Sequence, residues 1–116
     1  MPGRRLRIDV RPGVSITAIR VEPADDAGWT FIYAPGAGAN LQDPFGVHLC
    51  DALAARSVAA VRFQFPYMEA GRRSPDRTEL LEAAWRAVID ALRPERGKLA
   101  VGGRSMGGRI ASMVLA

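Results

Sequence analysis

Apolar and polar residues alternate along two stretches near the start of the chain. Residues 6–10 (LRIDV) and 15–21 (SITAIRV) are rich in β-branched residues and are separated by Arg11, Pro12 and Gly13. Alternation with a period of two is typical of strands that bury one face, and a short break containing Pro and Gly is typical of a turn. These residues therefore predict an antiparallel β-hairpin.

Three later stretches are apolar without alternation, which is typical of strands that are buried on both faces. They are WTFIYA (29–34), SVAAVRFQF (57–65) and KLAVGG (98–103). The polar segment 22–28 predicts a turn before the first of them, and Pro66 ends the second. We expect the first to be a buried central strand, the second to be a further core strand, and the third to be a short apolar strand.

Apolar residues at helical spacing fill the gaps between these strands. Asp43 and Pro44 form an N-cap and first-turn pair, which predicts a helix from about Pro44 to Arg56. Its apolar face is expected to contain Phe45, Leu49, Ala52 and Leu53. Ser74 and Pro75 give the same start signal for a second helix. The apolar stripe of this second helix contains Leu80, Leu81, Ala84, Trp85, Val88, Ile89 and Leu92.

Strands that alternate with helices at these spacings predict an α/β fold, with a mainly parallel sheet, an N-terminal antiparallel hairpin and helices on both faces. A chain of 116 residues forms at most one domain. Its last apolar helical run reaches Ala116 without a stop signal. We therefore expect residues 1–116 to be the N-terminal part of a single α/β domain whose C-terminal part is missing.

Composition narrows the class of protein further. Hydrophobic residues make up 48% and charged residues 24%, as in soluble globular proteins, and no stretch has the length of a membrane span. With no signal-peptide pattern, we expect a cytoplasmic protein without a membrane partner. The single cysteine, Cys50, excludes an internal disulfide, and we expect it to be buried and no metal site to be present. The net charge of +4 comes from scattered arginines, so no nucleic-acid partner is expected.

The chemistry-bearing motif is GRSMG at residues 103–107, which matches G-x-S-x-G between a predicted strand and a predicted helix. This pattern forms a sharp turn that holds the serine, here Ser105, in a strained conformation and exposes its hydroxyl. Side chains two residues before and after the serine would clash with the turn, which explains Gly103 and Gly107. Glycine-rich turns also bind phosphates, but the stretch matches neither common phosphate-binding pattern.

Two backbone segments are candidates for an oxyanion hole. The N–H of Met106 belongs to the first turn of the predicted helix, where unpaired amides and the helix dipole favour negative charge. A second donor is expected from the loop after the strand 29–34, with Ala37 as the first candidate and Gly38 as the second. Both segments follow core strands, so they should meet at the carboxyl edge of the sheet.

Four stretches together resemble the small dienelactone-hydrolase-like branch of the α/β-hydrolases. They are YAPGAGANLQDPF (33–45), RFQFPYM (62–68), GRRSPDR (71–77) and GGRSMGGRIASM (102–113). This branch includes a testis-expressed protein and the hydrolase-like domain of a subunit of the NSL chromatin complex. The resemblance implies that Ser105 is a nucleophile, that the Ala37 and Met106 amides are oxyanion donors, and that a small-molecule acyl substrate is hydrolysed without a cofactor. Pro35 stands where many relatives outside this branch have histidine.

The general base that a serine nucleophile needs is not evident in this chain. In this fold the acid and the histidine follow the serine, yet no Asp, Glu or His follows Ser105. The only histidine, His48, lies in the predicted first helix, where it could pair with Asp51 three residues later and act as a base. A partly buried helix histidine without a catalytic role is the preferred interpretation. We therefore expect a serine hydrolase that is catalytically incomplete as 116 residues.

Other interpretations remain open at this point. The chain fits a non-catalytic interaction module with a hydrolase-like fold, and a basic nucleic-acid binder is a weaker alternative. Residues 65–68 (FPYM) follow a core strand and either line an acyl pocket or pack in the core. Arg72, Arg73 and Arg104 either attract an anionic substrate or are solvated. No feature of the sequence specifies an oligomeric state.

Overall fold

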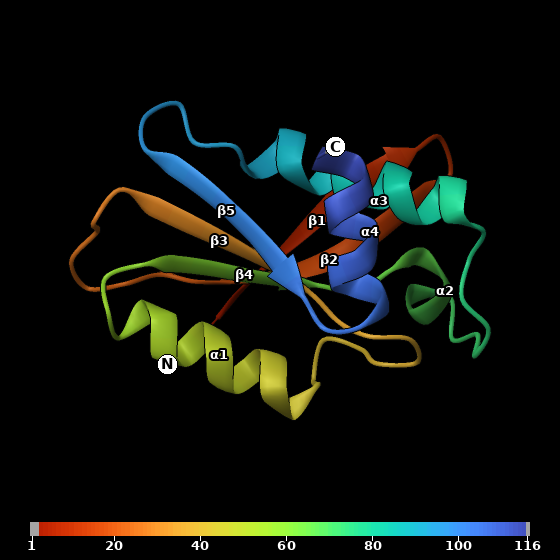
Figure 1. The fold of residues 1–116 in the computed structure, drawn as a ribbon, viewed down its shortest axis with the longest axis horizontal. Helices are drawn as coiled ribbons and strands as arrows, with labels where there is room; N and C mark the ends of the chain where they lie inside the picture. Colours follow the sequence, from red (N-terminus) through yellow and green to blue (C-terminus); the bar gives the residue numbers. More distant parts are fainter. Residues whose placement is uncertain (1–2, 116) are drawn as a thin grey trace.

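A five-stranded mixed sheet with helices on both faces forms the body of the protein (Figure 1). The structure is a computed structural model, which describes residues 3–115. In chain order the elements are β1 (Arg4–Arg11), β2 (Val14–Val21), β3 (Trp29–Ala34), α1 (Pro44–Ala54), β4 (Ala59–Phe63), α2 (Pro66–Glu69), α3 (Thr78–Leu92), β5 (Lys98–Gly103) and α4 (Met106–Leu115). The α/β fold class predicted from the sequence is confirmed.

The strand order is β1-β2-β4-β3-β5. The hairpin β1–β2 is antiparallel, as predicted, and β2 then joins β4 in the antiparallel sense, whereas β3 pairs in parallel with both β4 and β5. In the β3–β5 register, Ala34 lies opposite Gly103, so both strands end at the same level. The loops that follow them therefore start side by side at one edge of the sheet.

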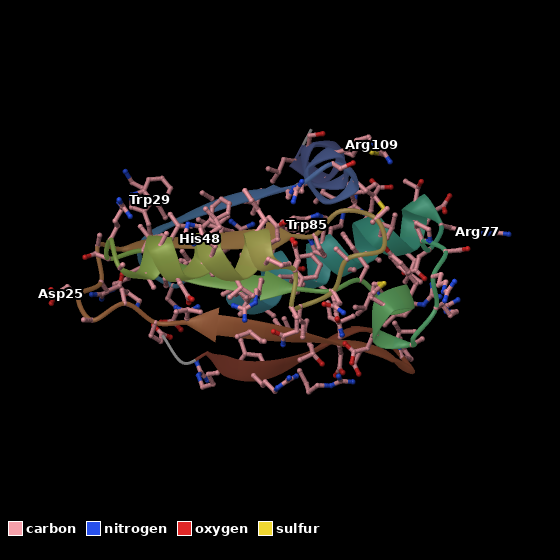
Figure 2. All side chains as sticks on the ribbon, turned by 90° about the horizontal axis from the view of Figure 1, so that it is seen from below. Asp25, Trp29, His48, Arg77, Trp85 and Arg109 are labelled. Atoms are coloured by element: carbon pink, nitrogen blue, oxygen red, sulfur yellow. The ribbon has the colours of Figure 1, made fainter. Side chains whose placement is uncertain are left out.

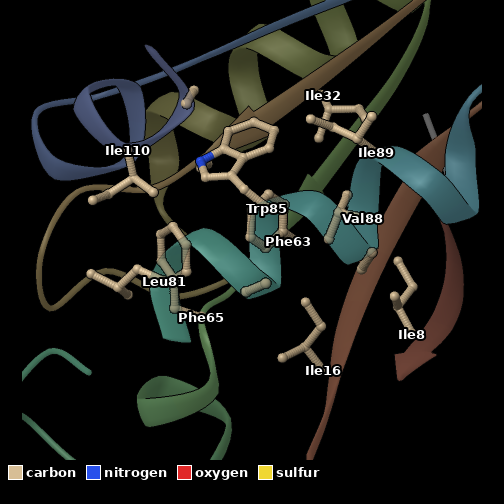
Figure 3. Close-up of a cluster of buried hydrophobic side chains, with 14 of the residues drawn as sticks. Ile8, Ile16, Ile32, Phe63, Phe65, Leu81, Trp85, Val88, Ile89 and Ile110 are labelled. Carbon is tan, nitrogen blue, oxygen red and sulfur yellow. The ribbon is translucent and has the colours of Figure 1, made fainter. Parts of the chain in front are cut away.

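The larger hydrophobic core lies between the sheet and the pair α3 and α4, and its centre is Trp85 (Figure 3). The Trp85 ring is fully buried and meets the Phe63 ring edge-on, with centroids 5.0 Å apart. The indole N–H donates a hydrogen bond to the carbonyl oxygen of Gly107 at 3.0 Å. The α3 stripe predicted from the sequence thus also holds the first turn of α4 in place.

Helix α1 covers the opposite face of the sheet, and its buried side matches the predicted one only in part. Its buried residues are Gly46, Cys50 and Ala54, while Phe45 is 47% exposed. A Cβ on Gly46 would lie only 2.6 Å from the Tyr33 ring, so the helix approaches the sheet through its small residues. The prediction is therefore wrong at Phe45, whereas Leu49 and Leu53 are partly buried and pack against the cluster around Cys50. The expected burial of Cys50 is confirmed. The N-cap at Asp43 is confirmed, since its carboxylate accepts from the amide of Phe45.

Two predicted boundaries are also wrong. Helix α3 begins at Thr78 and not at Ser74 and Pro75, which lie in an exposed turn. The strand expected over 57–65 is limited to β4, because Ser57 adopts a positive φ of 70° and Pro66 starts the short helix α2. Helix α2 itself has no periodic pattern, since one turn is too short to show one.

Within residues 3–115, none of the helices combines the length and the apolar character needed to cross a bilayer.

Candidate active site

Ser105 occupies the turn between β5 and α4 and has a backbone φ of 48°. This left-handed conformation costs a residue other than glycine about 1–3 kcal/mol, so it persists only where the surroundings impose it. The serine is exposed, and the residue after it is the first of α4. The turn therefore presents the hydroxyl to solvent at the carboxyl edge of the sheet.

The glycines on either side of the serine are sterically required. A Cβ on Gly103 would lie 2.5 Å from the carbonyl oxygen of Ala34, and one on Gly107 would lie 2.5 Å from the same atom. The end of β3 thus fits directly against the turn, where the Arg104 amide also donates to the Ala34 carbonyl at 3.2 Å. Gly108, which the motif does not specify, is equally confined, with its Cβ position 2.7 Å from the oxygen of Gly103.

The loop after β3 lies against the serine. A Cβ on Gly36 would be 3.6 Å from the Cβ of Ser105, so Gly36 faces Ser105 with room for no more than one methyl group between them. Gly36 accepts a hydrogen bond from the amide of Ala39 at 3.1 Å, which closes a tight turn around Ala37 and Gly38. Ala37 and Gly38 are both exposed, and Gly38 has a φ of 78°. The structure thus brings together the two segments that the sequence singled out.

The amides of these two segments differ in their partners. Within residues 3–115, neither the Ala37 nor the Met106 N–H has a hydrogen-bond acceptor. The Gly38 N–H, by contrast, donates to the hydroxyl of Tyr67 at 2.8 Å. In the first turn of α4, the Gly107 amide donates to the Arg104 carbonyl at 2.9 Å. The donors left without a partner are therefore Ala37 and Met106, beside an exposed serine.

Side chains of β4 and of the residue that follows it hold the rest of the loop, and sequence reasoning gave neither of them this role. The buried Arg62 donates through Nε to the carbonyl oxygen of Leu41 at 2.9 Å. The side-chain oxygen of Gln64 accepts from the amide of Leu41 at 3.2 Å. The partners lie more than twenty residues apart in the chain, so no local spacing signals them. Tyr67 and Gln64 do lie within or beside the RFQFPYM stretch, which is the only sequence signal for them.

Residues 65–68 prove to be part of the core. Phe65, Pro66 and Tyr67 are buried, and Met68 packs against the same cluster. Of the two interpretations left open, core packing is the one that the structure shows.

The three arginines that the sequence singled out differ in their partners. Arg104 lies with its guanidinium 5.0 Å from the centroid of the Phe45 ring, and Arg72 forms an ion pair with Asp76 at 3.2 Å, whereas Arg73 is exposed.

Burial and a hydrogen bond to Asp43 raise the pKa of Tyr33, so this hydroxyl stays neutral.

His48 is exposed on the outer side of α1 (Figure 2), so the expectation of a partly buried residue is wrong. Across residues 3–115, no hydrogen bond joins it to Ser105. The same part of the chain contains no group of three His, Cys, Asp or Glu residues that could hold a metal ion.

Three solved structures illustrate the similarity of this fold to known proteins. Est1E from Butyrivibrio proteoclasticus has a TM-score of 0.78 at 17% identity, over 97% of this chain and 45% of its own. XC6422 from Xanthomonas campestris, described as a serine hydrolase without a lid, has a TM-score of 0.79 at 22% identity. The match covers 99% of this chain and 59% of XC6422. A serine hydrolase homologue from Coxiella burnetii has a TM-score of 0.74 at 21% identity, and the match covers 98% of this chain and 57% of the homologue. The chain spans about half the length of these proteins.

No curated protein sequence matches the chain. A family model described as an alpha/beta hydrolase domain matches residues 27–116, which include both segments of the site. The match covers most of the chain, and the fold agrees with it. The chain therefore belongs to the α/β-hydrolase domain family.

Proposed function

We propose that this protein is a serine hydrolase of ester-like or related acyl substrates, with Ser105 as its nucleophile. The observation that carries the proposal is the contact between two segments: Ser105, at a φ of 48°, lies against Gly36 of the loop that contains Ala37. Family membership and neighbours described as serine hydrolases support it. The narrower dienelactone-hydrolase-like branch and the cytoplasmic location stay predictions.

In the proposed reaction, the Ser105 Oγ attacks the carbonyl carbon of the acyl group while a general base takes its proton. The carbonyl oxygen becomes an oxyanion, which accepts hydrogen bonds from the Ala37 and Met106 amides. The C–O bond to the leaving alcohol then breaks, and the alcohol takes the proton from the base. Water attacks the resulting acyl-enzyme in the same way and releases a carboxylic acid and free Ser105.

The base is the part of this scheme that residues 1–116 do not supply. No Asp, Glu or His follows Ser105 in the sequence, and His48 lies exposed on α1. We propose that the base and its orienting carboxylate come from outside these residues. The 116-residue chain by itself should then hydrolyse no ester above background.

Hydrolysis of p-nitrophenyl acetate and butyrate by the full gene product that carries this sequence tests the proposal. Ser105→Ala should lower kcat by about a thousandfold or more, because the nucleophile is lost. Ser112→Ala is the matched control, since Ser112 is exposed on the same helix and bonds only the carbonyl of Arg109. Equal activity of wild type and Ser105→Ala would refute the proposal.

A non-catalytic interaction module with this fold is the second candidate. It is favoured by the observation that, within residues 3–115, no side chain hydrogen-bonds to Ser105. It predicts that no acyl substrate is turned over by the full gene product and that binding of a protein partner survives Ser105→Ala.

A further inference from the structure

Tyr67 and Gly38 connect the buried core to the exposed loop beside Ser105. The fully buried Tyr67 accepts a hydrogen bond on its hydroxyl from the Gly38 amide at 2.8 Å. Gly38 is exposed, and a Cβ placed on it would meet nothing within 4 Å, so no packing holds this residue. We infer that Tyr67 is a positioning residue that orients the Ala37 amide toward Ser105, an inference that rests on the proposed function.

The peptide planes on both sides of Ala37 explain how the tether acts. The Gly36 carbonyl and the Ala37 N–H share one plane and point in opposite directions, because the peptide bond is trans. The Ala39 amide binds that carbonyl at 3.1 Å and draws it into the turn, so the Ala37 N–H faces away from the turn. The next plane contains the Gly38 N–H, which the Tyr67 hydroxyl fixes. The plane that contains the Ala37 N–H and the plane that follows it are therefore both held by hydrogen bonds.

Tyr67 is itself fixed by a buried carboxylate. Its backbone amide donates to Asp76 at 2.9 Å, and the Asp76 side chain is 2% exposed. The other oxygen of Asp76 accepts from Arg72 at 3.2 Å. A single helical turn such as α2 is not stable by itself, so contacts of this kind are needed to keep Tyr67 in place.

A second carboxylate ties α2 to the sheet. Glu69 accepts hydrogen bonds from the Thr17 amide of β2 and from Arg7, each at 2.8 Å. The Gln64 side chain, which also holds Leu41 of the loop, donates to Glu69 at 3.1 Å. The loop beside Ser105 is thus connected to β1 and β2 through polar side chains.

This arrangement matters because an oxyanion donor is effective only when it is oriented before the reaction. Removing one such donor lowers kcat by about 10²–10³-fold, and a donor that is present but less well oriented should cost less. Tyr67→Phe removes the hydroxyl and keeps the buried ring. We expect kcat on p-nitrophenyl butyrate to fall about 10- to 100-fold with KM within about twofold, because only transition-state binding is lost.

Tyr33→Phe is the matched control for this experiment. Tyr33 is also a buried tyrosine, and its hydroxyl donates to Asp43 at the other end of the same loop at 2.7 Å. Both variants lose one phenolic hydrogen bond to the loop, but Tyr33→Phe leaves Gly38 tethered. Its kcat should stay within about twofold of that of the wild type.

Amide hydrogen exchange in the full gene product gives a readout that does not depend on activity. In the wild type the Gly38 amide should exchange more slowly than the Ala37 amide, and Tyr67→Phe should accelerate Gly38 about tenfold. A wild-type Gly38 amide that exchanges as fast as Ala37 would overturn the inference, even if the variant fails to fold.

Other outcomes separate the two proposals. Wild-type activity that depends on Ser105 but is unchanged in Tyr67→Phe refutes the positioning role alone, as does an equal loss in Tyr33→Phe. A wild type without Ser105-dependent activity refutes the proposed function and the positioning role with it.

Discussion

A Cβ placed on Gly107 would lie 2.5 Å from the carbonyl oxygen of Ala34, the last residue of β3. The atom it would meet is backbone and cannot rotate away, so α4 would have to move off the end of β3. We expect Gly107→Ala to lower the free energy of unfolding by about 1–3 kcal/mol, the usual cost of overpacking. Urea unfolding followed by circular dichroism measures this.

Gly36→Ala is the control for that prediction. The atom nearest to a Cβ on Gly36 would be the carbonyl oxygen of Arg104 at 3.5 Å, which is an ordinary van der Waals contact. The φ angle of Gly36 is not positive, so the backbone also accepts an alanine. A Gly→Ala change in a compatible conformation stabilises by about 0.4–1 kcal/mol or has little effect. A Gly107→Ala variant as stable as Gly36→Ala would contradict the close approach of β3 to the turn.

Trp85 links the core to the first turn of α4 through its hydrogen bond to Gly107. Trp85→Phe removes this bond and leaves a void, so we expect a loss of about 2 kcal/mol in unfolding free energy. Trp29→Phe is the matched change at a residue that is 40% exposed, and it should cost less than about 0.5 kcal/mol. Thermal unfolding of both variants decides this, and equal losses would contradict the structure.

Glu69 should make stability depend on pH in the acid range. Its burial by itself would raise the pKa, but hydrogen bonds from Gln64, Arg7 and Thr17 outweigh burial and lower the pKa below its usual value. The ionised Glu69 carboxylate therefore stabilises the folded state fully above the pKa of an unfolded glutamate, about 4.3. This stabilisation is lost as the pH falls through the lower pKa that Glu69 has in the folded state.

Glu69→Gln tests this pH dependence. The variant should be less stable than the wild type at pH 7, and the difference in urea midpoint should shrink as the pH is lowered from about 5 to 3. Glu95→Gln, at an exposed position after α3, serves as the control. A difference between Glu69→Gln and wild type that is constant over this range would show that the carboxylate charge is not involved.

His48 should be dispensable for catalysis. Since it lies exposed on α1 and makes no hydrogen bond to Ser105 within residues 3–115, His48→Ala should leave kcat of the full gene product within about twofold. A loss comparable to that of Ser105→Ala, or Ser105-dependent esterase activity in the 116-residue chain, would identify His48 as a base and refute the proposal that the base lies elsewhere.

The parts of the fold that follow from local patterns were predictable from the sequence. The stripe around Trp85 places α3 on the sheet, and three apolar runs mark β3, β4 and β5, of which β5 lies at the edge of the described sheet. The G-x-S-x-G turn is also recognisable as a local pattern, although the atom closest to a Cβ on Gly103 or Gly107 is the Ala34 carbonyl oxygen of β3. Periodicity and short motifs lie within one segment, and a single sequence contains that information.

The features that sequence reasoning missed depend on contacts between distant segments. The buried face of α1 is set by how closely Gly46 approaches Tyr33, and hydrophobicity alone favours Phe45 instead. The Ser74 and Pro75 start signal fails, and the neighbouring Asp76 instead accepts a hydrogen bond from the distant Tyr67 amide. The bond from Gly38 to Tyr67 joins residues 29 positions apart, so no spacing rule could have identified it.

Covalent labelling with a fluorophosphonate, followed by peptide mass mapping of the full gene product, tests the identity of the nucleophile most directly. The account predicts one phosphonylated serine in the peptide that contains Ser105, and no labelling at that peptide in Ser105→Ala, while Ser112→Ala is labelled like the wild type. Labelling at another serine, or an unlabelled Ser105 in a folded protein that hydrolyses esters, would contradict it.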